Sequence, residues 1–226
     1  MTSRLLSPST PSSARMKPHR APRLSVHPDN PQGRHIARAV EGLKNGGIIV
    51  YPTDTVYGLG CDITQRDAID RIIKLKGRDP KKPMSFVCAD LTHISKYASV
   101  SDFAYKILKR HLPGPYTFVL PASRETPKIL QSKQRTVGIR IPDHAVPLAL
   151  VKELGEPLLS TSANRSSEET VSDPDDLEDR FGHDVDFIVE CGPLPVMPSS
   201  VISLVDDRVE IIREGAGDVA PFRSMS

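Results

Sequence analysis

The sequence predicts a single α/β domain, with a twisted, mixed, largely parallel sheet that helices cover on both faces. Apolar runs of strand length alternate along the chain with segments whose apolar residues recur at helical spacing. At 226 residues, the chain is long enough for one domain to bury a core of its own. It contains no internal repeat and no apolar run of about 18 residues, so we expect no solenoid and no membrane partner.

The first helix is predicted from residue 31 to residue 44. Its apolar residues recur at i, i+3, i+4 and i+7, and they are Ile36, Ala39, Val40 and Leu43. Residues 45–47 (Asn-Gly-Gly) end it, because glycine and asparagine adopt the left-handed conformation at little cost. The wholly apolar run 48–51 follows, which is typical of a strand buried on both faces.

Polar side chains come directly after this strand. Pro52 lacks an N–H donor and ends the strand, and Thr53, Asp54 and Thr55 follow it. In open α/β sheets, ligands bind at the carboxyl ends of strands, so we expect a site here. Gly58 and Gly60 leave room for another group to approach the backbone closely.

The remaining elements are predicted from the same patterns. Further helices are expected over residues 68–76, 101–111, 145–154 and from 173 onward. Further strands are expected at 84–88, 116–120, 136–140, 157–160, 187–189, 201–205 and 209–213. The acidic stretch 168–186 is interpreted as a solvated helix face.

Charge divides the chain into two parts. Residues 1–28 hold five basic side chains, no acids and five prolines, which predicts a disordered tail and places the domain at 29–226. A transit peptide and an overlong start before Met16 are the alternatives for the tail. The rest of the chain has 25 basic and 28 acidic residues, so it is not a generally basic nucleic-acid binder. The three cysteines (61, 88 and 191) lie far apart and are interpreted as reduced thiols of a cytoplasmic protein.

Three segments are candidates for an anion site. Lys76, Arg78 and Lys82 follow a predicted helix and form either a phosphate cradle or an exposed, solubilising loop. The run 160–164 (Ser-Thr-Ser-Ala-Asn) follows a strand and is either a ligand site or an ordinary turn. Arg140 and Arg213 each close a strand, and two such arginines indicate a ligand with more than one negative charge.

Several common catalytic motifs are missing from the sequence. It contains no Walker-type phosphate loop, no GxSxG and no HExxH. The histidines show no metal-ligand spacing, and we interpret His93, His111 and His144 as structural. A reaction here would therefore depend on positioning and charge stabilisation.

These segments together resemble the YrdC/YciO family, whose catalytic members are threonylcarbamoyl-AMP synthases. The resemblance runs from about Leu24 to the end of the chain. Its marks, in the order of the family, are 51–60 (YPTDTVYGLG), 76–78 (KGR) with 82–84 (KPM), 113–117 (PGPYT), 138–142 (GIRIP), 160–164 (STSAN), 199–202 (SSVI) and 213–215 (REG).

The resemblance implies an open, positively lined cavity that joins L-threonine, bicarbonate and ATP into threonylcarbamoyl-AMP and pyrophosphate. Mg²⁺ would arrive with the nucleotide, and the product would serve modification of adenosine 37 in tRNA through threonylcarbamoyl-transfer proteins. Lys76 and Arg78 would be catalytic. The implied ATP contacts are Lys76, Arg78, Lys82, Thr117, Ser160, Ser162, Asn164 and Arg213. The implied threonine contacts are Thr55, Arg140 and one of Ser199 and Ser200.

Two departures keep other functions open. Asp79 stands where the family commonly has proline, beside the expected phosphate cations. The flanks 26–32 and 213–219 resemble the YciO branch, whereas Thr55 and Asn164 match the synthase branch. The alternatives are a YciO-like protein that binds tRNA or double-stranded RNA through phosphate contacts, and an enzyme that adenylates another amino acid or carboxylate.

Overall fold

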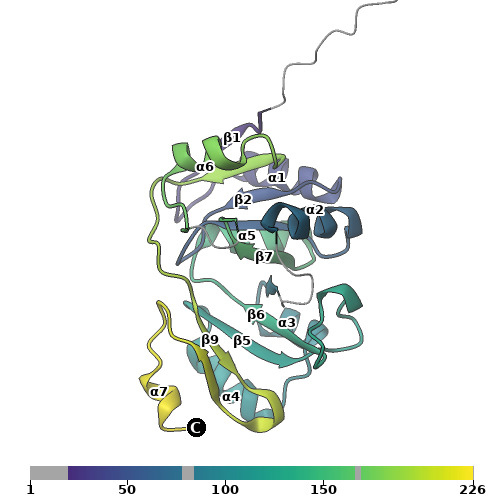
Figure 1. Cartoon of the computed structure of the whole chain (residues 1–226), viewed down its shortest axis with the longest axis vertical. Coiled ribbons are helices and arrows are strands. Elements are labelled where there is room, and N and C mark those ends of the chain that lie inside the picture. Colours follow the sequence, from purple (N-terminus) through teal and green to yellow (C-terminus); the bar gives the residue numbers. More distant parts are fainter. Residues whose placement is uncertain (1–19, 78–83, 166–168, 226) are drawn as a thin grey trace, which may run out of the picture.

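One ten-stranded sheet runs through the whole length of the molecule (Figure 1). The computed structural model describes residues 20–77, 84–165 and 169–225. Across the sheet the strand order is β1-β8-β2-β3-β7-β4-β6-β5-β9-β10. The strands are β1 (Arg23–Ser25), β2 (Ile49–Tyr51), β3 (Gly58–Asp62), β4 (Ser85–Val87), β5 (Tyr116–Pro121), β6 (Thr136–Arg140), β7 (Leu158–Ser162), β8 (Phe187–Glu190), β9 (Ser200–Ser203) and β10 (Glu210–Arg213).

Helices cover both faces of this sheet. They are α1 (Gly33–Lys44), α2 (Arg66–Lys76), α3 (Leu91–Tyr97), α4 (Asp102–His111), α5 (Ala145–Leu154), α6 (Pro174–Phe181) and α7 (Ala220–Arg223). The apolar residues of α1 and α5 pack together against one face, and those of α2, α4 and α6 pack against the other. The predicted α/β domain with a mixed sheet and helices on both faces is therefore confirmed.

Strand alternation decides which face carries polar groups. Phe86, Phe118 and Ile139 belong to the same buried cluster as the apolar residues of α4. Their neighbours in sequence, such as Ser85, Thr117 and Arg140, point to the opposite face and line a cavity. The helices α1 and α5 cover this opposite face only at the upper half of the sheet. The cavity thus lies on the part of the face beyond them.

The expectation of a largely parallel sheet is wrong. Of the nine strand pairings among the described residues, four are parallel and five are antiparallel. The main reason is β3, which was not predicted, because the glycines of Gly58-Leu59-Gly60 have low strand propensity. β3 pairs antiparallel with both β2 and β7. The short helix α3, which Asp90 caps, was also not predicted.

The expected boundary of the tail at residue 28 is also wrong. Arg23–Ser25 forms β1, which pairs parallel with β8, while residues 1–19 lie outside the described part. Arg20 contacts Glu178 and Asp179, and Arg23 contacts Asp175 and Glu178. The carboxylates of Asp175 and Asp179 on α6 are exposed, as predicted for a solvated helix face, and they also pair with the basic residues that were assigned to the tail.

Candidate functional site

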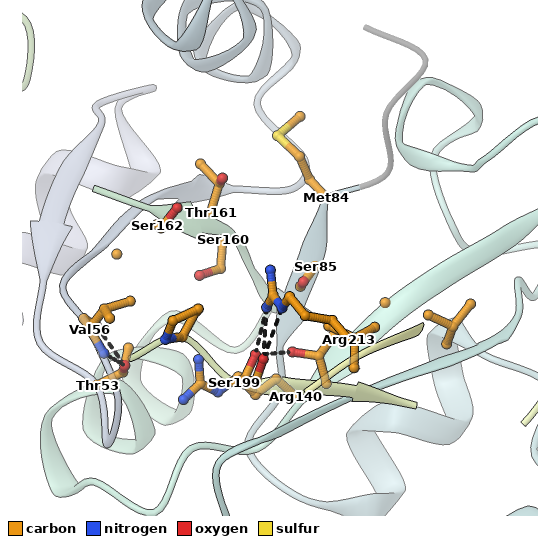
Figure 2. A pocket seen from close by; sticks show the side chains of 16 residues that line it. Thr53, Val56, Met84, Ser85, Arg140, Ser160, Thr161, Ser162, Ser199 and Arg213 are labelled. Carbon is orange, nitrogen blue, oxygen red and sulfur yellow. Dashed lines mark hydrogen bonds between the residues drawn. The ribbon is translucent and has the colours of Figure 1, made fainter. Parts of the chain in front are cut away.

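A cavity of about 270 Å³ opens on the sheet face beyond α1 and α5 (Figure 2). Its floor is formed by six neighbouring strands, in the order β3, β7, β4, β6, β5 and β9. Segments far apart in the sequence therefore meet there. Among the described residues it is lined by Thr53, Val56, Gly58, Met84, Ser85, Thr117, Val119, Gly138, Arg140, Ser160, Thr161, Ser162, Pro198, Ser199, Val201 and Arg213. Arginines and hydroxyls dominate its polar lining, which suits an anionic ligand.

Arg140 enters the cavity from the end of β6 and is nearly buried. Its Nη2 donates to the carboxylate of Asp54 and, at 2.8 Å, to Oγ1 of Thr55. Both ionic side chains are only 10% exposed. The Nε of Arg140 has no hydrogen-bond partner among the described residues. Arg140 also lines the cavity, so its positive charge favours an anionic ligand there.

The loop after β2 is organised around Arg140. Asp54 also accepts a bond from the backbone N–H of Asp143, at 3.1 Å, and so links this loop to the start of α5. Thr53 Oγ1 donates to the carbonyl of Val56 at 2.6 Å and accepts from two backbone N–H groups. Thr53 lines the cavity, whereas Thr55 is 1% exposed and contacts Arg140 behind the wall.

The second arginine reaches the cavity from β10. Nη2 of Arg213 donates to the carbonyl of Ser199 at 2.8 Å, and Nε donates to the same oxygen at 3.2 Å. Ser199 Oγ lies 2.8 Å from Oγ1 of Thr117 (Figure 2). The two strand-end arginines predicted from the sequence therefore meet at one cavity, although 73 positions separate them in the chain.

Ser199 and Ser200, which the sequence could not separate, have different surroundings. Ser199 lines the cavity. Ser200 is fully buried, and its Oγ donates to the carbonyl of Gly217 and accepts from the N–H of Gly215. Ser199 is therefore the serine that can contact a ligand, while Ser200 holds the C-terminal segment against β9.

The run 160–164 contributes Ser160, Thr161 and Ser162 to the cavity. Ser162 Oγ donates to the side-chain oxygen of Asn164 at 2.6 Å. Asn164 does not line the cavity. Its role is to fix the orientation of Ser162, so this segment is a site wall rather than an ordinary exposed turn.

Lys76 lies at the end of α2 and is only 4% exposed. Its Nζ donates to the carbonyl of Ser162 at 2.8 Å and to Oδ1 of Asn164 at 2.7 Å. The ammonium group therefore holds the segment 162–164 in place and does not line the cavity. Arg78 and Lys82 lie outside the described residues, so their predicted roles stay predictions.

Several lining residues were not predicted from the sequence. Ser85 and Val119 lie on strands that were predicted, but only the register of the sheet reveals that they face the cavity. Pro198 belongs to the segment between β8 and β9, which carries no periodic signal. Proline and glycine at strand ends were the signals available, and they mark turns rather than contacts.

Three further observations concern the described residues as a whole. No helix among them is both long and apolar enough to cross a bilayer. They contain no group of three or more His, Cys, Asp or Glu side chains placed to hold a metal ion. Cys61, Cys88 and Cys191 all have free thiols, and burial raises the pKa of each.

Known proteins resemble this chain along most of its length. YciO of Escherichia coli is 44% identical over 199 residues, which cover 87% of this chain and 97% of YciO. The crystal structure of E. coli YciO matches with a TM-score of 0.86 at 42% identity, covering 89% of this chain and 99% of that one. A threonylcarbamoyl-AMP synthase of Vibrio vulnificus is 33% identical over 158 residues, covering 69% of this chain and 85% of the enzyme.

A more distant structural match includes a bound amino acid. The structure of P. abyssi Sua5 complexed with L-threonine matches with a TM-score of 0.84 at 26% identity, covering 90% of this chain and 60% of Sua5. A family model named for Sua5, YciO and YrdC, described as "Telomere recombination", matches residues 41–215. With these similarities and a shared α/β fold, the chain belongs to the Sua5/YciO/YrdC family, which includes threonylcarbamoyl-AMP synthases.

Proposed function

We propose that the protein is an L-threonylcarbamoyl-adenylate synthase. The observation that carries the proposal is the meeting of Arg140 and Arg213 at one cavity whose walls present serine and threonine hydroxyls. Such a lining can hold a nucleotide phosphate and a carboxylate side by side. The relatives named as synthases, and the threonine complex of Sua5, support this substrate pair.

In the reaction, L-threonine and bicarbonate first form a carbamate with loss of water. A carbamate oxygen then attacks the α-phosphorus of ATP, the bond from that phosphorus to the bridging oxygen breaks, and pyrophosphate leaves. The carbamate is itself the nucleophile, so the protein has to align two anions and stabilise the departing charge.

The roles of the arginines follow from their surroundings. Arg140, which lines the cavity together with Thr53 and Val56, would bind the threonine carboxylate. Arg213, beside Thr117 and Ser199, would bind the phosphate groups. Lys76 would act by holding Ser162, because its ammonium is directed at the oxygens of 162–164.

Magnesium would enter with the nucleotide. Among the described residues, no carboxylate lines the cavity, and Asp54 behind it is bonded to Arg140. The described residues thus supply no ligand set of their own, and Mg²⁺ would be held by phosphate oxygens and water.

The test is an assay with purified protein, ATP, bicarbonate and radiolabelled threonine. We expect release of pyrophosphate and formation of a threonylcarbamoyl adduct, both dependent on threonine and on bicarbonate. Omission of either substrate is the control. Pyrophosphate release that does not depend on threonine and bicarbonate, or no release with the full mixture, would contradict the proposed synthase function.

A second candidate is a nucleotide- or RNA-binding protein with little synthase activity. The observation that favours it is the higher identity to YciO, 44%, than to the named synthase, 33%. In that case tRNA or double-stranded RNA would bind through its phosphates, and affinity would fall steeply with salt. Filter binding of tRNA at 50 and 200 mM salt, with wild type and Arg213→Ala, distinguishes this candidate when the synthase assay is negative.

A further inference from the structure

Tyr51 ends β2, yet its side chain reaches a strand that is not a neighbour of β2. In the sheet, β3 lies between β2 and β7. Adjacent strands are about 4.8 Å apart, so β2 and β7 lie about 9.6 Å apart. The hydroxyl of Tyr51 nevertheless donates to Oγ of Ser160, on β7, at 2.5 Å. The tyrosine side chain must therefore cross the face of β3.

Two glycines make this crossing possible. A Cβ atom at Gly60 would lie 2.8 Å from Cε1 of Tyr51 and 3.0 Å from the carbonyl oxygen of Leu159. A Cβ atom at Gly58 would lie 3.1 Å from the same ring. Both separations are closer than carbon atoms tolerate without displacement. The close approach that these glycines predicted is therefore the approach of the Tyr51 ring.

The direction of the hydrogen bond follows from burial. Tyr51 is fully buried, so its phenolic proton needs an acceptor, and Ser160 is the acceptor that the described residues provide. The opposite direction would leave the phenolic proton unpaired in the core, which is unfavourable. Burial also raises the pKa of Tyr51 to about 12, so the hydroxyl keeps its proton at neutral pH.

This direction determines what Ser160 can offer a ligand. A serine hydroxyl has one proton and two acceptor positions. Because Ser160 accepts from Tyr51 and lines the cavity, its own proton can be donated into the cavity. Ser162, two positions along the same strand, is opposite in polarity, since it donates its proton to Asn164. The two serines therefore present a donor and an acceptor to one ligand.

We propose that Tyr51 is a positioning residue that makes Ser160 a hydrogen-bond donor to an anionic oxygen of the substrate. The proposal rests on the proposed function, because the anion is a phosphate oxygen of the nucleotide or of pyrophosphate. Arg140 and Arg213 line the same cavity and provide the positive charge that such a group requires. Tyr51 itself lies outside the cavity and acts through Ser160.

The first experiment tests the hydrogen bond without any ligand. The chain has five tyrosines and no tryptophan, so a spectrum of tyrosine labelled with ¹³C at the hydroxyl-bearing carbon is simple. Tyr51→Phe assigns the Tyr51 signal. We expect Ser160→Ala to shift this signal and to leave that of Tyr57 in place, because Tyr57 donates to the carbonyl of Gly192 instead.

The second experiment measures binding of inorganic pyrophosphate by calorimetry. We expect Ser160→Ala to weaken binding at least about tenfold, as loss of a charge-assisted bond does. Tyr51→Phe should weaken it by a smaller factor, and the double variant should bind no more weakly than Ser160→Ala alone. Tyr57→Phe, which removes a hydroxyl from an equally buried tyrosine, is the matched control and should bind like the wild type.

Three outcomes would overturn the proposal: an unmoved Tyr51 signal in Ser160→Ala, additive losses in the double variant, or a wild type that does not bind pyrophosphate. A negative synthase assay together with the expected binding pattern would instead remove only the proposed synthase reaction. The two experiments thus separate the failure of one from the failure of the other.

Discussion

Arginine–carboxylate pairs occur in two regions of the molecule, at the N-terminal edge of the sheet and behind the cavity. At the edge, Arg23, whose side chain is 32% exposed, pairs with Asp175, whose side chain is 81% exposed. Behind the cavity, Arg140 pairs with Asp54, and both side chains are 10% exposed. The same kind of ion pair is therefore partly exposed to solvent at one site and nearly buried at the other. Burial, rather than the identity of the pair, decides what its loss costs.

The largest effect is expected when one partner of the buried pair is removed. In Asp54→Ala, Arg140 keeps its charge in a site that water hardly reaches, so we expect the free energy of unfolding to fall by about 3–5 kcal/mol. Urea denaturation measures it. Asp143→Ala, which changes an exposed carboxylate in the contacting loop, is the control.

The pair can also be replaced as a whole. Asp54→Leu combined with Arg140→Met leaves no unpaired charge, so the double variant should recover most of the stability that Asp54→Ala loses. It should have no synthase activity, because Arg140 is missing. A double variant as unstable as Asp54→Ala would contradict the importance of the unpaired charge. In that case, the comparison between the two regions would fail.

The next effect concerns the cavity arginine on β10. If Arg213 binds the phosphates in the transition state, Arg213→Ala should lower kcat/KM for ATP by about 10- to 150-fold, equivalent to 1.5–3 kcal/mol. Steady-state kinetics of pyrophosphate release measures it. Arg208→Ala, in the turn that precedes the same strand, removes an exposed arginine and should leave kcat/KM unchanged. Equal effects of the two variants would argue against phosphate binding by Arg213.

Burial disfavours the charged form of three histidines. It lowers the pKa of His93, His111 and His144 from the ordinary 6.5, so the folded protein favours their neutral form. Below pH 6.5 the unfolded chain takes up protons that the folded chain does not, so stability should fall between pH 7 and pH 5.5. Urea denaturation at several pH values measures this loss.

His144 offers a way to isolate one contribution. It caps α5 by accepting from the N–H of Val146, a role that asparagine also performs without titrating. His144→Asn should therefore keep the helix and reduce the loss of stability between pH 7 and pH 5.5. An unchanged loss in this variant would show that His144 does not contribute.

The smallest effect is expected at the exposed pair. Asp175→Ala, which removes the 81% exposed carboxylate and leaves Arg23 its contact with Glu178, should lower the free energy of unfolding by about 0–1 kcal/mol, and less at high salt. Urea denaturation at 50 mM and 500 mM salt measures it. A loss as large as that in Asp54→Ala would break the comparison, because exposure would then not explain the difference.

The sequence was informative wherever the pattern is local. The helix over Ile36 to Leu43 and the strand ending at Tyr51 follow from periodicity, and the structure contains both. The cap of α4 by Ser101 is also local, and its side chain accepts from the N–H of Ala104. Such features depend on neighbours within about one helical turn, which the sequence displays directly.

Features that depend on sheet pairing could not be predicted in this way. β3 was missed because its glycines argue against a strand, and their purpose becomes visible only beside the ring of Tyr51. The pairing of Asp54 with Arg140 spans 86 positions. The predicted convergence of Arg140 and Arg213 at one cavity was correct. The contact of Lys76 with phosphate stays a prediction, and the bond from Lys76 to the carbonyl of Ser162 could not be predicted from the sequence.

The crossing of β3 by Tyr51 has a consequence for how this protein can change over time. A methyl group at position 60 collides with the ring, and a smaller residue at position 51 leaves a hole beside glycine. Each single replacement is therefore penalised, and a smaller residue at position 51 removes the clash of a Cβ at position 60 with the ring but not its close approach to the carbonyl oxygen of Leu159. Residues 51 and 60 should accordingly co-vary among relatives, and any relative with a side chain at 60 should lack the tyrosine at 51.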